Sequence, residues 1–182
     1  LVPVSDADRS EHKKLMETRQ AKDDPEANCL PTGVPRIAPY PWRIVQTPTH
    51  MLMAYEFAHA ARTIFLDGTP HMDDLDFWMG DGRGRWEGDT LVIDTVSLGD
   101  QTWFDQAGNF HSDALKVTER FTPTDASHIS YEVTIDDSKV FTRPWKMNMI
   151  IYRRLEKNLE LLDYECAEHI YEKVFKEKAG KP

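Results

Sequence analysis

Residues Trp78–Phe121 read WMGDGRGRWEGDTLVIDTVSLGDQTWFDQAGNFHSDALKVTERF. Glu87-Gly88-Asp89 predicts a tight turn, because glycine reaches positive φ without a Cβ clash. The β-branched run Thr90–Val96 that follows is typical of a strand, and Leu115–Phe121 predicts a second one. The glycines at positions 80, 82 and 84 indicate loosened backbone ahead of the turn. This stretch therefore predicts a β fold.

One residue of the second predicted strand stands out. Side chains alternate along a strand, so Glu119 shares a face with Leu115, Val117 and Phe121. Burying an unpaired carboxylate costs several kcal/mol, so Glu119 must be paired, neutralised or hydrated. Two interpretations follow. Glu119 is either a structural ion pair or barrel-mouth residue, or it is a general acid or base that lines a pocket.

The totals fit one soluble domain. The chain has 182 residues, of which 40% are hydrophobic and 29% charged, which is ordinary for a globular protein. The formal net charge of −9 argues against nucleic acid or an anionic membrane surface as a partner. No apolar run approaches the roughly 18 residues that a membrane helix needs. We therefore expect a small molecule as the partner.

Turn signals divide the chain into short β segments. We predict a mainly β fold, an antiparallel meander that closes into a lipocalin-like barrel of about eight strands, with a sandwich as the alternative. Residues 1–24 form an N-terminal helical arm, and residues 25–182 form one barrel-like domain that ends in a helix at His169–Lys178. The proline-rich lead-in Asn28–Trp42 is extended and lies across the core. The remaining predicted strands are Arg43–Thr47, Met51–Phe57, Arg62–Leu66, Ile129–Ile135, Trp145–Arg153 and Leu159–Glu165.

The catalytic candidates are His111, Glu119 and Asp105. His111 follows the turn Ala107-Gly108-Asn109, and a histidine at a loop rim can move protons near neutral pH. An ordinary surface histidine is the alternative. In the catalytic interpretation His111 and Glu119 exchange protons, and Asp105 orients His111 or shares the load.

Residues that bind the substrate would surround this group. Trp103 would stack on it, and His71 would guard the rim. Arg62 and Arg120 would hold an anionic or carbonyl oxygen, although strand alternation points Arg120 away from Glu119. Trp86 and Tyr55 complete the predicted pocket.

Cofactor signatures are missing from the sequence. Gly80, Gly82 and Gly84 do not have the dinucleotide-binding spacing, and the histidines lack the usual metal-ligand spacings. There is no Gly-x-Ser-x-Gly nucleophile elbow. We therefore predict chemistry without a metal or cofactor. A metal ion bound by His71, His111 and a carboxylate is the alternative.

The two cysteines, Cys29 and Cys166, are not in a C-x-x-C pair. They are either two buried thiols or one disulfide. A bridge between them would close a loop of more than a hundred residues and stabilise the fold by roughly 4–5 kcal/mol in the chain-entropy model. The bridge would indicate an oxidising compartment.

Several motifs resemble a family of uncharacterised exported proteins from environmental bacteria. The resemblance covers about residues 24–169 and implies export to the periplasm or beyond the cell, as well as pairing of Cys29 with Cys166. It implies no activity. In a looser sense the meander resembles lipocalin or calycin barrels. The motifs are Cys29-Leu30-Pro31, Asp67-Gly68-x-Pro70-His71, Trp86-Glu87-Gly88-Asp89-Thr90-Leu91-Val92, Trp103-x-Asp105, His111-Ser112, Thr118-Glu119-Arg120-Phe121 and Tyr164-Glu165-Cys166.

These observations favour an acid–base enzyme of the lyase, dehydratase or isomerase type. It would act on a small aromatic or sugar-derived molecule in a barrel pocket. Two alternatives belong to other classes. One is a non-catalytic exported protein that binds a small ligand. The other is a structural module that forms a homodimer through the N-terminal arm.

Overall fold

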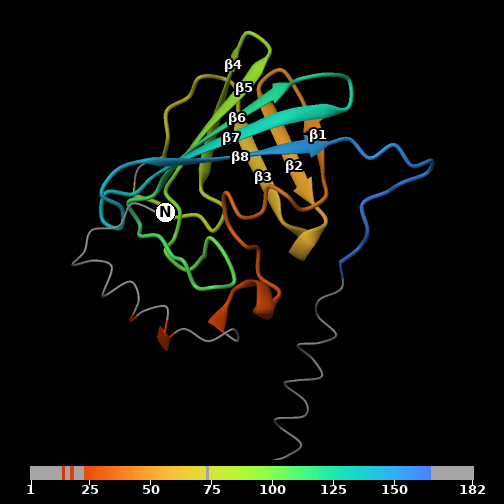
Figure 1. Cartoon of the computed structure of the whole chain (residues 1–182). Coiled ribbons are helices and arrows are strands. Elements are labelled where there is room, and N and C mark those ends of the chain that lie inside the picture. Colours follow the sequence, from red (N-terminus) through yellow and green to blue (C-terminus); the bar gives the residue numbers. More distant parts are fainter. Residues whose placement is uncertain (1–13, 15–16, 19–22, 73, 165–182) are drawn as a thin grey trace, which may run out of the picture.

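The computed structural model describes residues 14, 17–18, 23–72 and 74–164. Within these residues one sheet contains eight strands, whose order in space follows the sequence (Figure 1). The described residues also include two short 3-10 turns, η2 (Glu26–Asn28) and η3 (Phe57–His59). The strands are β1 (Trp42–Gln46), β2 (His50–Tyr55), β3 (Ala61–Phe65), β4 (Asp81–Glu87), β5 (Thr90–Val96), β6 (Lys116–Pro123), β7 (His128–Asp136) and β8 (Trp145–Tyr152).

The sheet is mainly antiparallel, but one pair corrects the predicted meander. β3 and β4 run parallel, with Ile64 opposite Gly82 and Phe65 opposite Arg83. The loop 66–80 causes this, because it carries the chain back along β3 before β4 begins. A two-residue turn at Gly88-Asp89 joins β4 to β5, as the sequence predicts, with Gly88 at φ +61°.

The prediction of a closed barrel is wrong. β1 and β8 lie at the two edges of the sheet and do not pair with each other, so the curled sheet is a half-barrel. The expected strand Leu159–Glu165 is absent over its described residues, 159–164. β4 takes its place in the total of eight. β4 has no strand signal in the sequence because of its glycines. An added Cβ on Gly82 would lie 2.6 Å from Ile64, so these glycines let β4 approach β3 closely.

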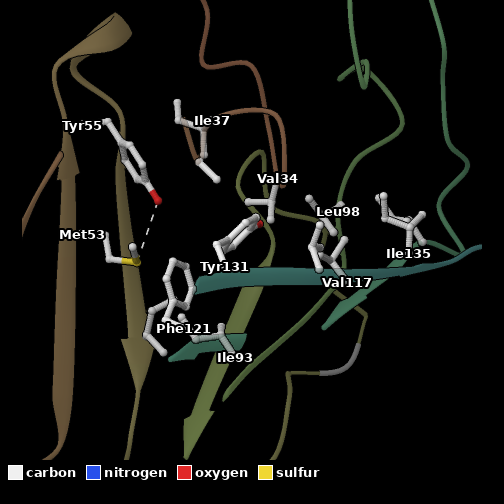
Figure 2. Packing of buried hydrophobic residues seen from close by; sticks show 14 of the residues in the cluster. Val34, Ile37, Met53, Tyr55, Ile93, Leu98, Val117, Phe121, Tyr131 and Ile135 are labelled. Atoms are coloured by element: carbon white, nitrogen blue, oxygen red, sulfur yellow. Dashed lines mark hydrogen bonds between the residues drawn. The ribbon is translucent and has the colours of Figure 1, made fainter. Parts of the chain in front are cut away.

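A segment before β1 fills part of the space that the curled sheet leaves open. Residues 30–41, called the plug here, place Val34 and Ile37 in the core at 2% and 0% exposure (Figure 2). Gly33 lets the plug turn at φ +81°, where a side chain would meet Thr102 at 2.6 Å. The proline-rich lead-in thus packs on the core as expected, but the prediction that it is extended is wrong. Residues 34–39 form turns, closed by backbone hydrogen bonds such as that from Ile37 to Gly33 at 3.0 Å.

The core lies on the concave face of the sheet. Period-two alternation buries every second residue of β7, and Tyr131, Val133 and Ile135 are each 0% exposed. Met53 on β2 and Ile93 on β5 face the same core (Figure 2). This packing explains why one face of each strand is apolar in the sequence.

Both predicted terminal helices fall largely on residues that the structure does not describe, so they stay predictions. The same holds for dimer formation through the N-terminal arm. Among the described residues, no helix is both long and apolar enough to cross a membrane.

Candidate functional site

Glu119 is completely buried on the concave face, where it forms an ion pair with Arg62. The Arg62 Nη2 lies 2.6 Å from Glu119 Oε2, and Nη1 lies 3.3 Å from Oε1. The Tyr131 hydroxyl donates to Oε1 at 2.9 Å, and Arg62 also donates to Thr95 Oγ1 at 3.2 Å. Both ends of the pair are therefore satisfied by protein groups.

The protonation of this cluster follows from burial and charge. Burial alone would lower the pKa of the Arg62 guanidinium, but the charge of Glu119 outweighs it, and the pKa of Arg62 is raised. Burial, and then the neighbouring Glu119 charge, raise the pKa of the Tyr131 hydroxyl well above its usual value. Arg62 thus stays charged and Tyr131 stays a hydrogen-bond donor at neutral pH.

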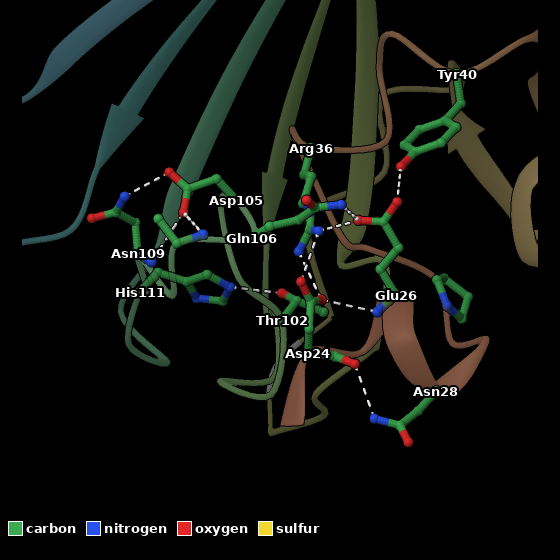
Figure 3. Close-up of polar contacts among 12 residues, drawn as sticks. Asp24, Glu26, Asn28, Arg36, Tyr40, Thr102, Asp105, Gln106, Asn109 and His111 are labelled. Carbon is green, nitrogen blue, oxygen red and sulfur yellow. Dashed lines mark hydrogen bonds and ion pairs between the residues drawn. The ribbon is translucent and has the colours of Figure 1, made fainter. Parts of the chain in front are cut away.

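His111 has a different set of partners. Its Nε2 lies 2.7 Å from Thr102 Oγ1 (Figure 3). Its Nδ1 lies 2.9 Å from the Ser112 carbonyl oxygen. Because a carbonyl oxygen only accepts, Nδ1 carries a proton. His111 is 3% exposed. The hydrogen bonds described for His111 and Glu119 share no residue.

Asp105 and Trp103 hold the loop that carries His111. Asp105 accepts hydrogen bonds from the backbone of Ala107 and from both the backbone and side chain of Asn109 (Figure 3). Trp103 is 6% exposed and forms a β-bridge with Phe110. The carboxylate of Asp105 therefore stabilises a turn, rather than orienting the imidazole by a described hydrogen bond.

His71 is anchored on β4. Its Nδ1 lies 3.0 Å from Asp81 Oδ2, and Asp81 also accepts from the backbone of Met72 and from Arg83. Burial would raise the pKa of the Asp81 carboxyl, but these hydrogen bonds hold it below its usual value. This network pins the loop before β4 to the sheet.

The other predicted binding residues lie on two different faces. Tyr55 is buried beside the ion pair of Arg62 and Glu119, and its hydroxyl lies 3.8 Å from Met53 Sδ (Figure 2). Arg120 points to the opposite face, as alternation predicts, and pairs with Glu87 at 2.9 Å. Trp86, near the β4–β5 turn, is 50% exposed. The fold thus brings Tyr55, Arg62 and Glu119 together, while Arg120 and Trp86 lie away from them.

One cavity opens where the barrel stays unclosed. This seam cavity has a volume of about 740 Å³ and lies between β1 and the end of β8. Trp42 and Ile44 line it from β1, and Ile151 lines it from β8. Residues 153–164, called the strap here, run from β8 towards η3, and the Leu162 backbone donates to Glu56 at 3.0 Å.

Charged groups surround this apolar lining. Arg154 pairs with Glu156 at 2.8 Å, and His128 pairs with Asp125 at 2.9 Å. Arg43 and Arg153 also line the cavity, and neither makes an ion pair within the described part of the chain. Within the described residues, the cavity therefore offers an apolar lining with two guanidinium groups that no carboxylate neutralises by direct contact. The lining carboxylates Glu56 and Glu160 make no ion pair there either.

The second cavity lies beside the plug and has a volume of about 620 Å³. Arg36 and Tyr40 of the plug line it together with Glu26. Arg36 holds both oxygens of Asp24 at 2.9 Å and contacts Glu26, which also accepts from the Tyr40 hydroxyl (Figure 3). We call this space the plug cavity.

Of the residues that line these two cavities, the sequence singled out Asp105 alone as a site candidate, and it lines the plug cavity. Arg153-Arg154 directly after a predicted strand is a local signal that could have marked the seam. Arg43 and Trp42 carry no such signal, because their value depends on β1 being an unpaired edge. Neither the seam cavity nor the plug cavity is lined by Glu119 or His111.

The described residues include one of the two cysteines and no metal-binding cluster of side chains. Among the described residues, no group of three or more histidine, cysteine or acidic side chains could hold a metal ion. Cys29 follows η2 at a left-handed position, φ +57°. Cys166 lies outside the described residues, so the bridge between them stays a prediction.

No family model, curated protein or solved structure matches the chain. The resemblance to exported bacterial proteins therefore stays an expectation, and so does export itself. The likeness to lipocalins is limited to a curled antiparallel sheet that does not close.

Proposed function

We propose that the protein binds a small amphipathic molecule in the seam cavity. The observation that carries this proposal is the position of the cavity between the two unpaired edges of the half-barrel. Its volume of about 740 Å³ falls in the usual range for sites that bind small molecules. Most such sites combine apolar walls with a few polar groups that fix the orientation of the ligand.

The lining defines the chemistry of the ligand. Trp42, Ile44 and Ile151 give apolar contact for a ring or short hydrocarbon. Arg43 and Arg153 favour an anionic group, because a guanidinium binds carboxylate in a planar, two-pronged geometry. A small aromatic or aliphatic carboxylate satisfies both requirements.

A matched pair of probes tests this proposal. 4-Phenylbutyrate carries the anionic group and 4-phenylbutan-1-ol lacks it, and isothermal titration calorimetry measures both dissociation constants. We expect the carboxylate to bind more tightly. The double variant Arg43→Gln/Arg153→Gln should weaken its binding about tenfold, because each exposed charge pair contributes up to about 1 kcal/mol. The binding of the alcohol should change less than about twofold.

Two further variants complete the test. Arg143→Gln is the control, because Arg143 is exposed, lines neither cavity and makes no described ion pair. Ile151→Trp should narrow the seam cavity and weaken binding of both probes without unfolding the sheet. Undiminished binding to a folded Ile151→Trp variant, or no binding of either probe to the wild type, would refute the proposal.

The acid–base reaction predicted from the sequence stays a prediction. A separate observation reduces its support, since Glu119 is held by Arg62 and Tyr131 while His111 is held by Thr102 and Ser112. Proton exchange between His111 and Glu119 would require these partners to be released. Ligand binding in the seam cavity requires no such rearrangement.

A further inference from the structure

The plug cavity has no lining residue in common with the seam cavity. Its walls come from three parts of the chain that are distant in sequence: the plug with the nearby Glu26, the loop 104–107, and β8. It opens to solvent on the concave side of the sheet, next to the edge strand β8. A ligand here would therefore bind independently of one in the seam.

Part of the lining is apolar and aromatic. Met147 and Met149 from β8 lie beside Phe104 of the loop and Tyr40 of the plug. Phe104 is fixed by ring contacts, with its centroid 6.0 Å from that of Trp145. Tyr40 is fixed in the same way, 4.7 Å from Phe57. These two ordered aromatic rings and two thioether side chains would bind a polarisable or cationic group of a ligand.

The charge around the cavity is negative. Asp24 and Glu26 both bind Arg36, so two carboxylates share one guanidinium. Asp105 is a third carboxylate, and its described hydrogen bonds come from neutral donors. The Glu26 side chain keeps 20% of its surface exposed. The three carboxylates thus outnumber the single guanidinium of Arg36, and this excess negative charge would attract a positively charged ligand.

Tyr40, which lines the cavity, keeps its hydroxyl proton at neutral pH. Burial, and then the hydrogen bond to Glu26, raise the pKa of the Tyr40 hydroxyl above its usual value. Tyr40 therefore stays neutral and keeps Glu26 in place instead of adding a competing charge. Gln106 contributes a second neutral donor to Glu26 at 3.3 Å (Figure 3).

From this lining we infer that the plug cavity is a second binding site, and that it takes an organic ammonium cation with an apolar body. The ammonium group would lie near Glu26 and Asp105, and the body would contact Phe104, Met147 and Met149. This inference goes beyond the proposed seam site and does not depend on it.

The experiment uses benzyltrimethylammonium as the probe and benzyl alcohol as its uncharged counterpart. Methyl resonances of Met147 and Met149 report binding by NMR, and the buried Met51 serves as an internal reference. We expect the cation to shift the methyl resonances of the two lining methionines in a saturable way, without shifting that of Met51. The dissociation constant of the cation should be at least about fivefold lower than that of the alcohol.

Charge variants decide whether the plug cavity is the site. Gln106→Lys places a positive charge at the exposed mouth and should weaken cation binding about fivefold, with the alcohol unchanged. Gln46→Lys makes the same change at an exposed position outside both cavities and should have no effect. Glu26→Gln should weaken binding of the cation about tenfold. If Glu26→Gln does not fold, Gln106→Lys still tests the inference.

Two results would overturn the inference. One is equal binding of the cation and the alcohol. The other is cation binding that Gln106→Lys leaves unchanged. The seam variant Arg43→Gln/Arg153→Gln should not alter the methionine shifts, so failure of the seam proposal and failure of this one are distinguishable.

Discussion

Removing either partner of the buried pair between Arg62 and Glu119 should strongly destabilise the protein. The Arg62 side chain is 2% exposed and that of Glu119 is 0% exposed, so water cannot replace the lost partner. We expect Glu119→Gln to lower the free energy of unfolding by about 3–5 kcal/mol, because it leaves an uncompensated buried guanidinium. Arg62→Met should cost a similar amount. That is a large fraction of the roughly 5–15 kcal/mol that stabilises a domain.

The double variant Arg62→Met/Glu119→Leu separates pairing from burial. Replacing both charges by apolar groups of similar volume is often nearly neutral, so the double variant should lose much less than the sum of the two single variants. A coupling energy of at least about 2 kcal/mol is expected. Urea denaturation followed by tryptophan fluorescence measures all three values.

The neighbouring pair of Arg120 and Glu87 is the control. It is made of the same residue types, but the side chains are 38% and 41% exposed. Arg120→Met should therefore change stability by no more than about 1 kcal/mol. If Glu119→Gln is as mild as Arg120→Met, the buried-pair reasoning is wrong, and Glu119 lies in a hydrated pocket that could serve chemistry.

Three further predictions concern the backbone, pH and the cysteines. Gly33→Ala should destabilise by about 2–4 kcal/mol in chemical denaturation, and Gly68→Ala by only about 1–2 kcal/mol. Both glycines have positive φ, but only the Cβ at Gly33 meets a neighbour; equal losses would contradict this. The lowered folded-state pKa of Asp81 stabilises the fold above the unfolded value of about 4, and this contribution is lost as pH falls through the folded value. Asp81→Asn should therefore flatten the loss of stability below about pH 4, and an unchanged slope would argue against the network. Mass spectrometry without reductant should show Cys29 and Cys166 oxidised, and two alkylatable thiols in protein from an oxidising compartment would refute the bridge.

Strand positions were largely predictable from local patterns. The run Thr90–Val96 coincides with β5, and the predicted strand Ile129–Ile135 lies within β7. Both carry β-branched residues in a buried setting, so local preference and final packing agree. β4 was missed because Gly82 and Gly84 lower strand propensity, and the contact with β3 that needs them is a tertiary feature.

The candidate site was predictable only in part. Alternation showed that Glu119 faces an apolar side and needs a neutralising partner. The sequence did not identify Arg62 as that partner, because Arg62 was assigned to hold an oxygen of the substrate. Alternation does not show whether the first and last strands meet. The seam cavity exists because β1 and β8 do not pair, so Trp42 and Ile151 could not be identified from sequence. The loop of His111 was recognised, but its partner Thr102 was not.

The open half-barrel has a consequence for solubility. Within the described chain, β1 and β8 each pair with one neighbouring strand. The free edge of each therefore presents unpaired amide and carbonyl groups, with which a strand of another copy could form hydrogen bonds. Charge on such edges discourages intermolecular joining. Arg43 lies on β1 and Arg153 directly follows β8. Neutralising these two arginines should therefore make concentrated protein prone to edge-to-edge aggregation.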